Sequence, residues 1–171
     1  MTNLKGINIE KVTLNIGVGQ PGDKLEKAMK LLKTITGAKP IQTKTMKRIP
    51  SWGIRPRLAI ASKVTIRGKK AEELLKRLLD AVDNVIPEKK FDLHGNFSFG
   101  IQEYINISNV NYDVEVGIIG LEVAVTFTRP GYRIQKRLLK KSKISKNHKL
   151  KREEVIQYMK DNFKIKTGEE E

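Results

Sequence analysis

Basic side chains are concentrated in two stretches of this 171-residue sequence. The chain carries 34 Lys and Arg residues against 19 Asp and Glu residues, which gives a formal net charge of +15. Ten of the basic residues lie in 39–70 and eleven in 129–152, and neither stretch contains an acidic residue. Such stretches place positive potential where it can neutralise phosphates and release counterions, whereas a lysine enrichment that serves only stability brings glutamate with it. The sequence therefore predicts a polyanion-binding protein, with an anionic membrane surface as a weaker alternative to nucleic acid.

A glycine-rich segment, Gly17-Val18-Gly19-Gln20-Pro21-Gly22, lies between a predicted strand and a predicted helix. Its Gly-x-Gly-x-x-Gly spacing matches the dinucleotide fingerprint, in which glycines let the backbone approach a pyrophosphate at a helix N-terminus. That site also needs an acidic residue about twenty positions further on, and this chain has no Asp or Glu between Glu26 and Glu72. We therefore expect no nucleotide cofactor, and we expect the turn to bring backbone amides close to an RNA phosphate.

Residues that support catalysis or metal binding are scarce. The sequence has no cysteine, which excludes disulfides, thiolate metal sites and a cysteine nucleophile. The two histidines, His94 and His148, lie in different segments without a metal-binding spacing, and we expect both to be surface-loop residues. We predict no enzymatic activity, no metal and no cofactor. Met1 to Gln20 lacks the pattern of a secretory signal and no stretch is long and apolar enough for a membrane helix, so a soluble protein of the cytoplasm is expected.

Apolar periodicity predicts the elements that position these residues. Strands are expected over 7–16, 39–45, 61–67, 97–107 and 117–128, and helices over 23–36, 70–86 and 152–163. The stretch 46–60 is rich in proline and glycine and predicts a long loop, which is either functional or disordered. This order predicts an α+β fold: an antiparallel or mixed sheet with helices packed on one face and the other face open for RNA. We expect two parts, an α+β RNA-binding core domain over 1–128 and a basic C-terminal extension over 129–171 whose terminal helix packs on the core.

The second and third predicted strands carry polar side chains at alternating positions. Because side chains alternate between the two faces of a sheet, several of them can project together from the open face. These residues are Lys39, Thr43, Lys63, Thr65 and Arg67. Trp52, the only tryptophan, lies between two arginines of the long loop. It suits either a small satellite core or stacking on an unpaired base.

Four separated segments resemble one known family in their order and spacing. They are Ile9-Glu10-Lys11-Val12-Thr13-Leu14-Asn15-Ile16-Gly17-Val18-Gly19, then Thr36-Gly37-Ala38-Lys39-Pro40 with Thr43-Lys44, then Lys63-Val64-Thr65-Ile66-Arg67-Gly68, and finally Gly95-Asn96-Phe97-Ser98-Phe99-Gly100-Ile101-x-Glu103. Together they are similar to ribosomal protein five of the large subunit, the 5S-rRNA-binding family, over residues 7–128. The stretch that begins with Arg129-Pro130-Gly131-Tyr132-Arg133, and the helix after it, resemble the archaeal and eukaryotic branch.

The resemblance implies a non-enzymatic ribosomal protein that binds 5S rRNA and helps form the central protuberance of the large subunit. The implied partners are 5S rRNA, 23S rRNA, peptidyl-site tRNA, neighbouring large-subunit proteins of the central protuberance and a protein of the small-subunit head. Together with the strand pattern, the resemblance implies these candidate 5S rRNA-binding residues: Asn15, Gly17, Gly19, Lys39, Thr43, Lys44, Lys63, Thr65 and Arg67. The long loop is expected to contact the tRNA through Lys47, Arg48, Trp52, Arg55 and Arg57. Additional RNA contacts are expected from Arg133, Lys136, Arg137, Lys140 and Lys141 of the basic extension.

Two segments depart from the family pattern. Ala38 stands where the family usually has glutamine, and the family's Ile-Arg-x-Gly-x-Pro-Ile-Gly reads Ile54-Arg55-Pro56-Arg57-Leu58-Ala59-Ile60-Ala61 in this chain.

Two other classes of function also compete with the ribosomal one. A basic DNA-binding or chromatin-type protein predicts comparable affinity for duplex DNA, and an RNA-modifying or nucleotide-dependent enzyme predicts a clustered acid–base or cofactor site.

Overall fold

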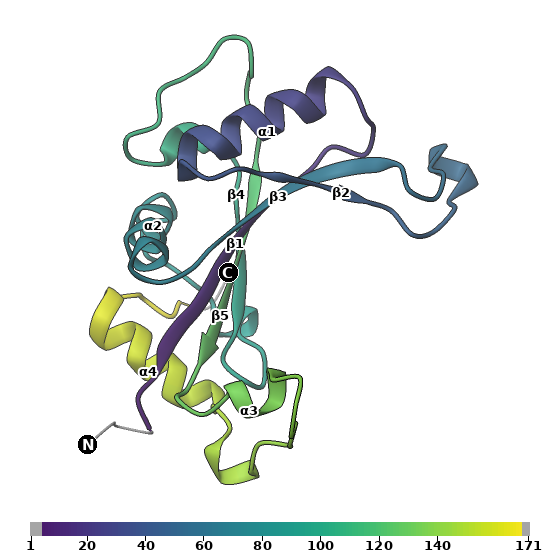
Figure 1. Ribbon diagram of the computed structural model, residues 1–171. Coiled ribbons are helices and arrows are strands. Elements are labelled where there is room, and N and C mark those ends of the chain that lie inside the picture. The colour runs from purple at the N-terminus through teal and green to yellow at the C-terminus, as the bar shows by residue number, and fades with distance from the viewer. Residues whose placement is uncertain (1–4, 169–171) are drawn as a thin grey trace.

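A computed structural model describes residues 5–168 and contains a five-stranded antiparallel sheet with helices packed against it (Figure 1). The strand order is β2-β3-β1-β5-β4, and each neighbouring pair is antiparallel. The strands are β1 (Asn8–Gly17), β2 (Ile41–Lys44), β3 (Ala59–Ile66), β4 (Phe97–Ile101) and β5 (Leu121–Thr128). The predicted α+β class is confirmed, and of the two sheet types expected the antiparallel one is present.

Four α-helices accompany the sheet in the described residues. They are α1 (Asp23–Thr36), α2 (Lys69–Asp80), α3 (Arg133–Lys136) and α4 (Arg152–Phe163). The boundaries of α1 and α4 match those predicted from the sequence. Gly37 ends α1 because it adopts a left-handed φ of 65°, and its N–H donates to the carbonyl of Lys33 at 2.8 Å.

One face of the sheet is buried against helices. In the central strand β1, Val12, Leu14 and Ile16 are at most 2% exposed, and they share one core with Leu32 of α1 and Leu75 of α2. Burial of one such side chain contributes about 1.5–3 kcal/mol. Because a one-residue slip would turn all of them toward solvent, this face fixes the strand register.

Helix α4 packs on the same face at the other end of the sheet. The rings of Phe127 in β5 and Tyr158 in α4 meet edge to face with centroids 6.2 Å apart. Gly95, in the turn before β4, has φ 79°, and a Cβ atom there would lie 2.3 Å from Cγ2 of Val155. A side chain at this turn would therefore push α4 away from the sheet.

The helix predicted over 70–86 is wrong at its C-terminal end, because α2 stops at Asp80. Asp83 and Asn84 adopt positive φ angles of 54° and 59°, and the N–H of Asn84 donates to the carbonyl of Leu79 at 3.0 Å. Ile86 is still fully buried. Its N–H donates to the carbonyl of Lys166 at 3.0 Å, and this hydrogen bond holds the turn against the C-terminal segment.

The strands predicted over 97–107 and 117–128 are both too long. β4 ends at Ile101 and β5 begins at Leu121, so residues 102–120 form a connection outside the sheet. This connection still fills the core with Tyr104, which is 0% exposed and whose hydroxyl accepts a hydrogen bond from the N–H of Asp113 at 3.0 Å. Apolar residues beyond Ile101 thus continue the core from a loop.

The segment between β5 and α4 contains only α3 and a 3₁₀ turn over Lys146–His148, and side-chain hydrogen bonds hold it in place. The hydroxyl of Tyr132 accepts a hydrogen bond from the N–H of Leu150 at 2.7 Å. The ring Nε2 of His148 lies 2.9 Å from the carbonyl oxygen of Pro130. His148 is therefore half-buried and structural, which corrects its expected place on a surface loop, whereas His94 is exposed as expected.

Candidate RNA-binding surface

The face of the sheet opposite the helices carries the predicted polar side chains. The register pairs Asn15 with Lys63 and Thr13 with Thr65, and it pairs Thr43 with Ala61. Directly paired residues of antiparallel strands share a face, so the structure brings these polar residues together on three neighbouring strands. All of them are exposed or half-buried. This surface is called the open face below.

Sequence analysis missed one acidic residue on the open face. Glu122 of β5 is paired with Asn15, and the amide Nδ2 of Asn15 donates to Oε2 of Glu122 at 3.3 Å. The hydrogen bond fixes the Asn15 amide and leaves its carbonyl oxygen as the acceptor available to a ligand. The alternation of buried Leu121 and Val123 around exposed Glu122 was the signal that could have located it.

Two backbone amides of the glycine turn are already used within the protein. The N–H groups of Val18 and Gly19 both donate to the carbonyl of Ile60, at 2.9 and 2.8 Å, so neither is free for a phosphate. Gly19 has φ 84°, and a Cβ atom at Gly17 or Gly19 would have no neighbour within 4 Å. The turn therefore leaves its backbone open to a ligand, although these two N–H groups are not available as donors.

Three predicted basic residues lie at the ends of strands rather than within the open face. Lys39 precedes β2 and Arg67 follows β3, and both are exposed at the same end of the antiparallel pair. Lys44 is the last residue of β2, at the opposite end, next to the long loop. Ala38, which replaces the family's glutamine, packs against the core and contributes no polar group.

The predicted long loop is ordered around a small bridge. Ile49 and Ile54 exchange two backbone hydrogen bonds of 3.0 Å, and Ile54 is only 6% exposed. Residues 59 and 60, expected in the loop, belong to β3. Trp52 is 71% exposed, so its interpretation as a satellite core residue is wrong. Instead it lines a groove together with Gly19 of the glycine turn.

The basic residues of the loop are all exposed, and one has an unusual backbone. Lys47, Arg48 and Arg55 point into solvent. Arg57 adopts a left-handed φ of 67°, and its N–H donates to the carbonyl of Thr45 at 2.7 Å. The loop therefore presents a fixed cluster of cations beside an exposed indole.

The basic C-terminal segment is only partly available for RNA. Lys136 forms an ion pair with Glu10, and Nε of Arg137 donates to the carbonyl of Lys140 at 2.7 Å. The side chains of Arg133 and Lys141, with that of Lys140, are exposed and without a charged partner among residues 5–168.

Arg129 belongs to the protein interior rather than to the basic surface. Its side chain is 7% exposed and pairs with Glu154 of α4 at 2.8 Å. Burial of the Glu154 carboxyl acts to raise its pKa, but the hydrogen bond from the N–H of Lys151 and the Arg129 guanidinium outweigh burial and leave the pKa below the ordinary value of 4.5. The pair joins the end of β5 to the terminal helix.

A second ion-pair cluster holds the 102–120 connection against α1. Nζ of Lys30 lies 3.0 Å from Oδ2 of Asp113 and 2.7 Å from Oε2 of Glu115. The hydrogen bond from Lys30 lowers the pKa of Asp113, and the bond to Glu115 raises the pKa of Lys30. The same connection exposes large apolar side chains, with Val114 82% and Ile118 64% accessible.

Residues 5–168 contain no group of three or more His, Cys, Asp or Glu side chains arranged to hold a metal ion. None of the described helices is long and apolar enough to cross a membrane. The described residues thus combine a polar sheet face, a basic loop with an exposed indole and a basic C-terminal segment. Together these features are typical of a nucleic-acid-binding α+β protein.

Comparison with known proteins identifies the family. A model described as ribosomal protein L5 matches residues 4–55, and one described as the C-terminus of the same ribosomal protein family matches residues 59–146. The large ribosomal subunit protein uL5 of Nanoarchaeum equitans is 50% identical over 163 residues, which cover 95% of this chain and 96% of that protein. The uL5 proteins of Sulfurisphaera tokodaii and Methanosphaera stadtmanae are 45% and 44% identical, over 95% and 92% of this chain and 92% and 94% of their own lengths.

The chain belongs to the ribosomal protein L5 family, in its archaeal type. It is accordingly a structural, non-enzymatic constituent of the large subunit of the cytoplasmic ribosome, and it binds rRNA. The predicted class of function and the predicted absence of enzymatic activity are confirmed.

Proposed function

We propose that this protein binds 5S rRNA through the open face and helps form the central protuberance of the large subunit. The observation that carries the proposal is the cluster of Asn15, Lys63, Thr65 and Thr43 on three adjacent strands, on the face that the helices leave uncovered. Side chains cannot readily enter the deep major groove of A-form RNA. The hydroxyl and amide groups of this face, together with Lys63 and the cations at the strand ends, therefore suit contacts to the backbone and 2′-hydroxyl groups of a folded RNA.

The loop that follows β2 is proposed to contact peptidyl-site tRNA. Support comes from its anchoring by the Ile49–Ile54 bridge, which holds Arg48, Arg55 and the exposed Trp52 at its tip. The arginines fit phosphates, and the indole fits an unpaired base or a ribose.

The remaining proposed partners use the other surfaces. Exposed Arg133, Lys140 and Lys141 suit phosphates of 23S rRNA. The 102–120 connection, which is acidic and exposes Val114, suits the neighbouring proteins of the central protuberance and the proposed bridge to a protein of the small-subunit head. On this view residues 5–128 are the RNA-binding core, and residues 129–168 are an extension that α4 fastens to it.

A competition experiment tests the 5S rRNA proposal. The purified protein is titrated with 5S rRNA, an unrelated folded RNA of the same length and duplex DNA, each at two salt concentrations. We expect a preference for 5S rRNA that persists at the higher salt, because shape and hydrogen bonds add to counterion release. Equal and salt-sensitive binding to all three would contradict the proposal and favour a general binder of the chromatin type.

A further inference from the structure

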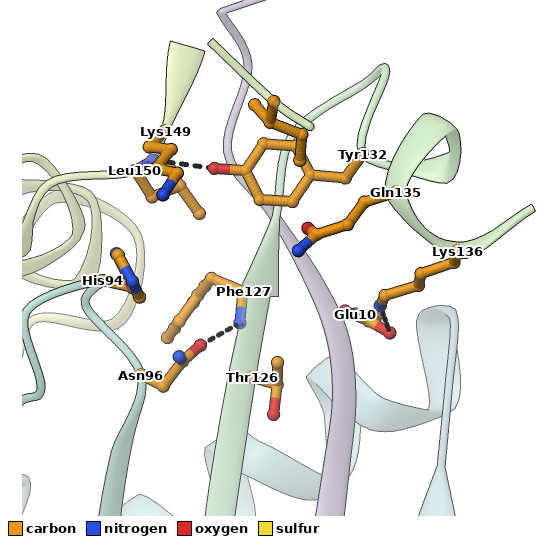
Figure 2. A pocket seen from close by; sticks show the side chains of 11 residues that line it. Glu10, His94, Asn96, Thr126, Phe127, Tyr132, Gln135, Lys136, Lys149 and Leu150 are labelled. Atoms are coloured by element: carbon orange, nitrogen blue, oxygen red, sulfur yellow. Dashed lines mark hydrogen bonds and ion pairs between the residues drawn. The ribbon is translucent and has the colours of Figure 1, made fainter. Parts of the chain in front are cut away.

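A cavity at the end of the sheet is not used by any function described so far. It encloses about 210 Å³ between the turn before β4, the end of β5 and the segment that follows α3 (Figure 2). This is smaller than the roughly 300–1,000 Å³ of pockets that hold drug-sized ligands. The cavity therefore has room for one planar ring system rather than for a larger molecule.

Aromatic rings and amide groups form its walls. The ring of Tyr132 lies on one side and Phe127 on the other, and Gln135 reaches into the space between them (Figure 2). The Asn96 amide is fixed, because its Oδ1 accepts from the N–H of Phe127 at 3.0 Å and its Nδ2 donates to Asp92 at 2.9 Å. Within residues 5–168 the side-chain amide of Gln135 has no hydrogen-bond partner, so both its donor and its acceptor are available.

The charge and position of the cavity favour RNA. Its one acidic side chain, Glu10, is neutralised by Lys136, while exposed Lys149 adds positive charge at the rim. Thr126 is paired with Lys11 in the sheet register, two residues along β1 from Thr13 on the open face. The cavity thus lies where an RNA that follows the open face would reach the end of β5.

We propose that this cavity receives one unpaired base of the bound RNA, an inference that rests on the proposed RNA-binding function. Unpaired bases are recognised by stacking on aromatic side chains and by hydrogen bonds to their edges. Tyr132 provides the ring, Gln135 provides a donor and an acceptor for the base edge, and Lys149 faces the adjoining phosphate. A free nucleotide offers the same chemistry, so the test separates the two sources.

The first measurement needs no variant. Backbone amide NMR signals of the protein are followed during titration with each of the four nucleoside 5′-monophosphates and, in parallel, with ribose 5-phosphate. We expect the nucleotides to shift the signals of Thr126, Gln135 and Leu150, and ribose 5-phosphate to leave them unchanged. Equal shifts with ribose 5-phosphate would show an anion on lysine and would overturn the proposal.

The second measurement uses RNA. The variant Gln135→Leu removes the amide that reaches into the cavity and keeps a side chain of similar size. We expect about tenfold weaker binding to 5S or 23S rRNA, the size of the loss of one or two hydrogen bonds. The matched control, Gln157→Leu on the exposed side of α4, should bind as the wild type does.

The outcomes separate this inference from the proposed function. Unchanged RNA affinity of the Gln135→Leu variant, in a protein that binds 5S rRNA normally, would overturn the base pocket alone. Nucleotide binding at the cavity in a protein without any preference for 5S rRNA would overturn the proposed function and assign the cavity to a free nucleotide.

Discussion

Arg57 shows how a single residue adapts the loop that is proposed to contact tRNA. Its φ of 67° is left-handed, a conformation that costs an L-residue about 1–2 kcal/mol and that glycine adopts freely. The family pattern has glycine at this position, whereas this chain has a cation next to Arg55. The loop therefore gains a charge at a conformational cost.

Replacement of Arg57 by glycine or by alanine separates backbone strain from charge. Both variants lose the guanidinium, but only Arg57→Gly relieves the left-handed strain. We expect Arg57→Gly to exceed Arg57→Ala in free energy of unfolding by about 1 kcal/mol, measured by urea denaturation. Affinity for tRNA should fall equally in the two variants, and unequal affinities would show that loop conformation, rather than charge, governs this contact.

Sequence analysis located polar residues of the site better than it described their backbone. Alternation placed Lys63 and Thr65 on one face, because the strand period is fixed by covalent geometry. It did not show that Gly19 donates its N–H to Ile60, because that partner lies in another strand and is determined only by the tertiary fold.

At the scale of elements, α4 depends on a charge pair as well as on apolar packing. Arg129 is nearly buried at the end of β5, and its guanidinium pairs with the carboxylate of Glu154. The same carboxylate accepts a hydrogen bond from the N–H of Lys151, which caps the first turn of α4. Loss of the carboxylate leaves a buried cation and an uncapped helix start.

The Glu154→Gln variant tests this attachment by its pH dependence. The pKa of Glu154 in the folded state lies below the ordinary 4.5, so its contribution to stability is complete above pH 4.5 and is lost as the pH falls through the folded value. We expect a loss of about 1–2 kcal/mol at pH 7, less than for a fully buried pair because Glu154 is 41% exposed. Thermal or urea unfolding should show this difference shrink below pH 4.5, and a difference independent of pH would rule out the charge pair as its cause.

The elements were predictable where their ends carry local signals. Gly37 marked the C-terminal end of α1, since a glycine stop acts within one turn. The overestimate of α2 arose because Val82 and Ile86 continue the helical spacing of apolar residues, while the left-handed turn at Asp83 is not encoded by a glycine. In the same way, the apolar pattern around Tyr104 predicts a strand, whereas Tyr104 fills the core from a 3₁₀ turn outside the sheet.

At the scale of the whole molecule, the long loop after Lys44 and the basic C-terminal segment lie at opposite ends of β1. Gly17 is paired with Ala61 near the loop, and Asn8 with Thr128 just before the C-terminal segment (Figure 1). Ten residues of strand span about 30 Å, which exceeds the screening length of about 8 Å at physiological ionic strength. The charges of the loop and of the C-terminal segment can therefore bind different phosphates without interacting with each other through solvent.

Charge-removing variants in the basic stretches 39–70 and 129–152 should have additive effects on the free energy of RNA binding. Lys44→Ala with Arg67→Ala is expected to weaken 5S rRNA binding by about 1–3 kcal/mol in total and to reduce the slope of log affinity against log salt by about 1–2. Adding Lys140→Ala and Lys141→Ala should give the sum of the separate effects within about 0.5 kcal/mol. The matched control, Lys27→Ala with Lys33→Ala on exposed positions of α1, removes the same charge from the helix side and should leave most of the affinity intact.

The central position of β1 also determines when the protein can complete its sheet during synthesis. β1 is made first, yet its neighbours in the sheet begin at Ala59 and Leu121. Most of its pairing is therefore remote in sequence, which slows folding. A nascent chain cannot close its sheet until the ribosome that makes it has translated past residue 128, so completion of the fold and of the surface for RNA is a single late event.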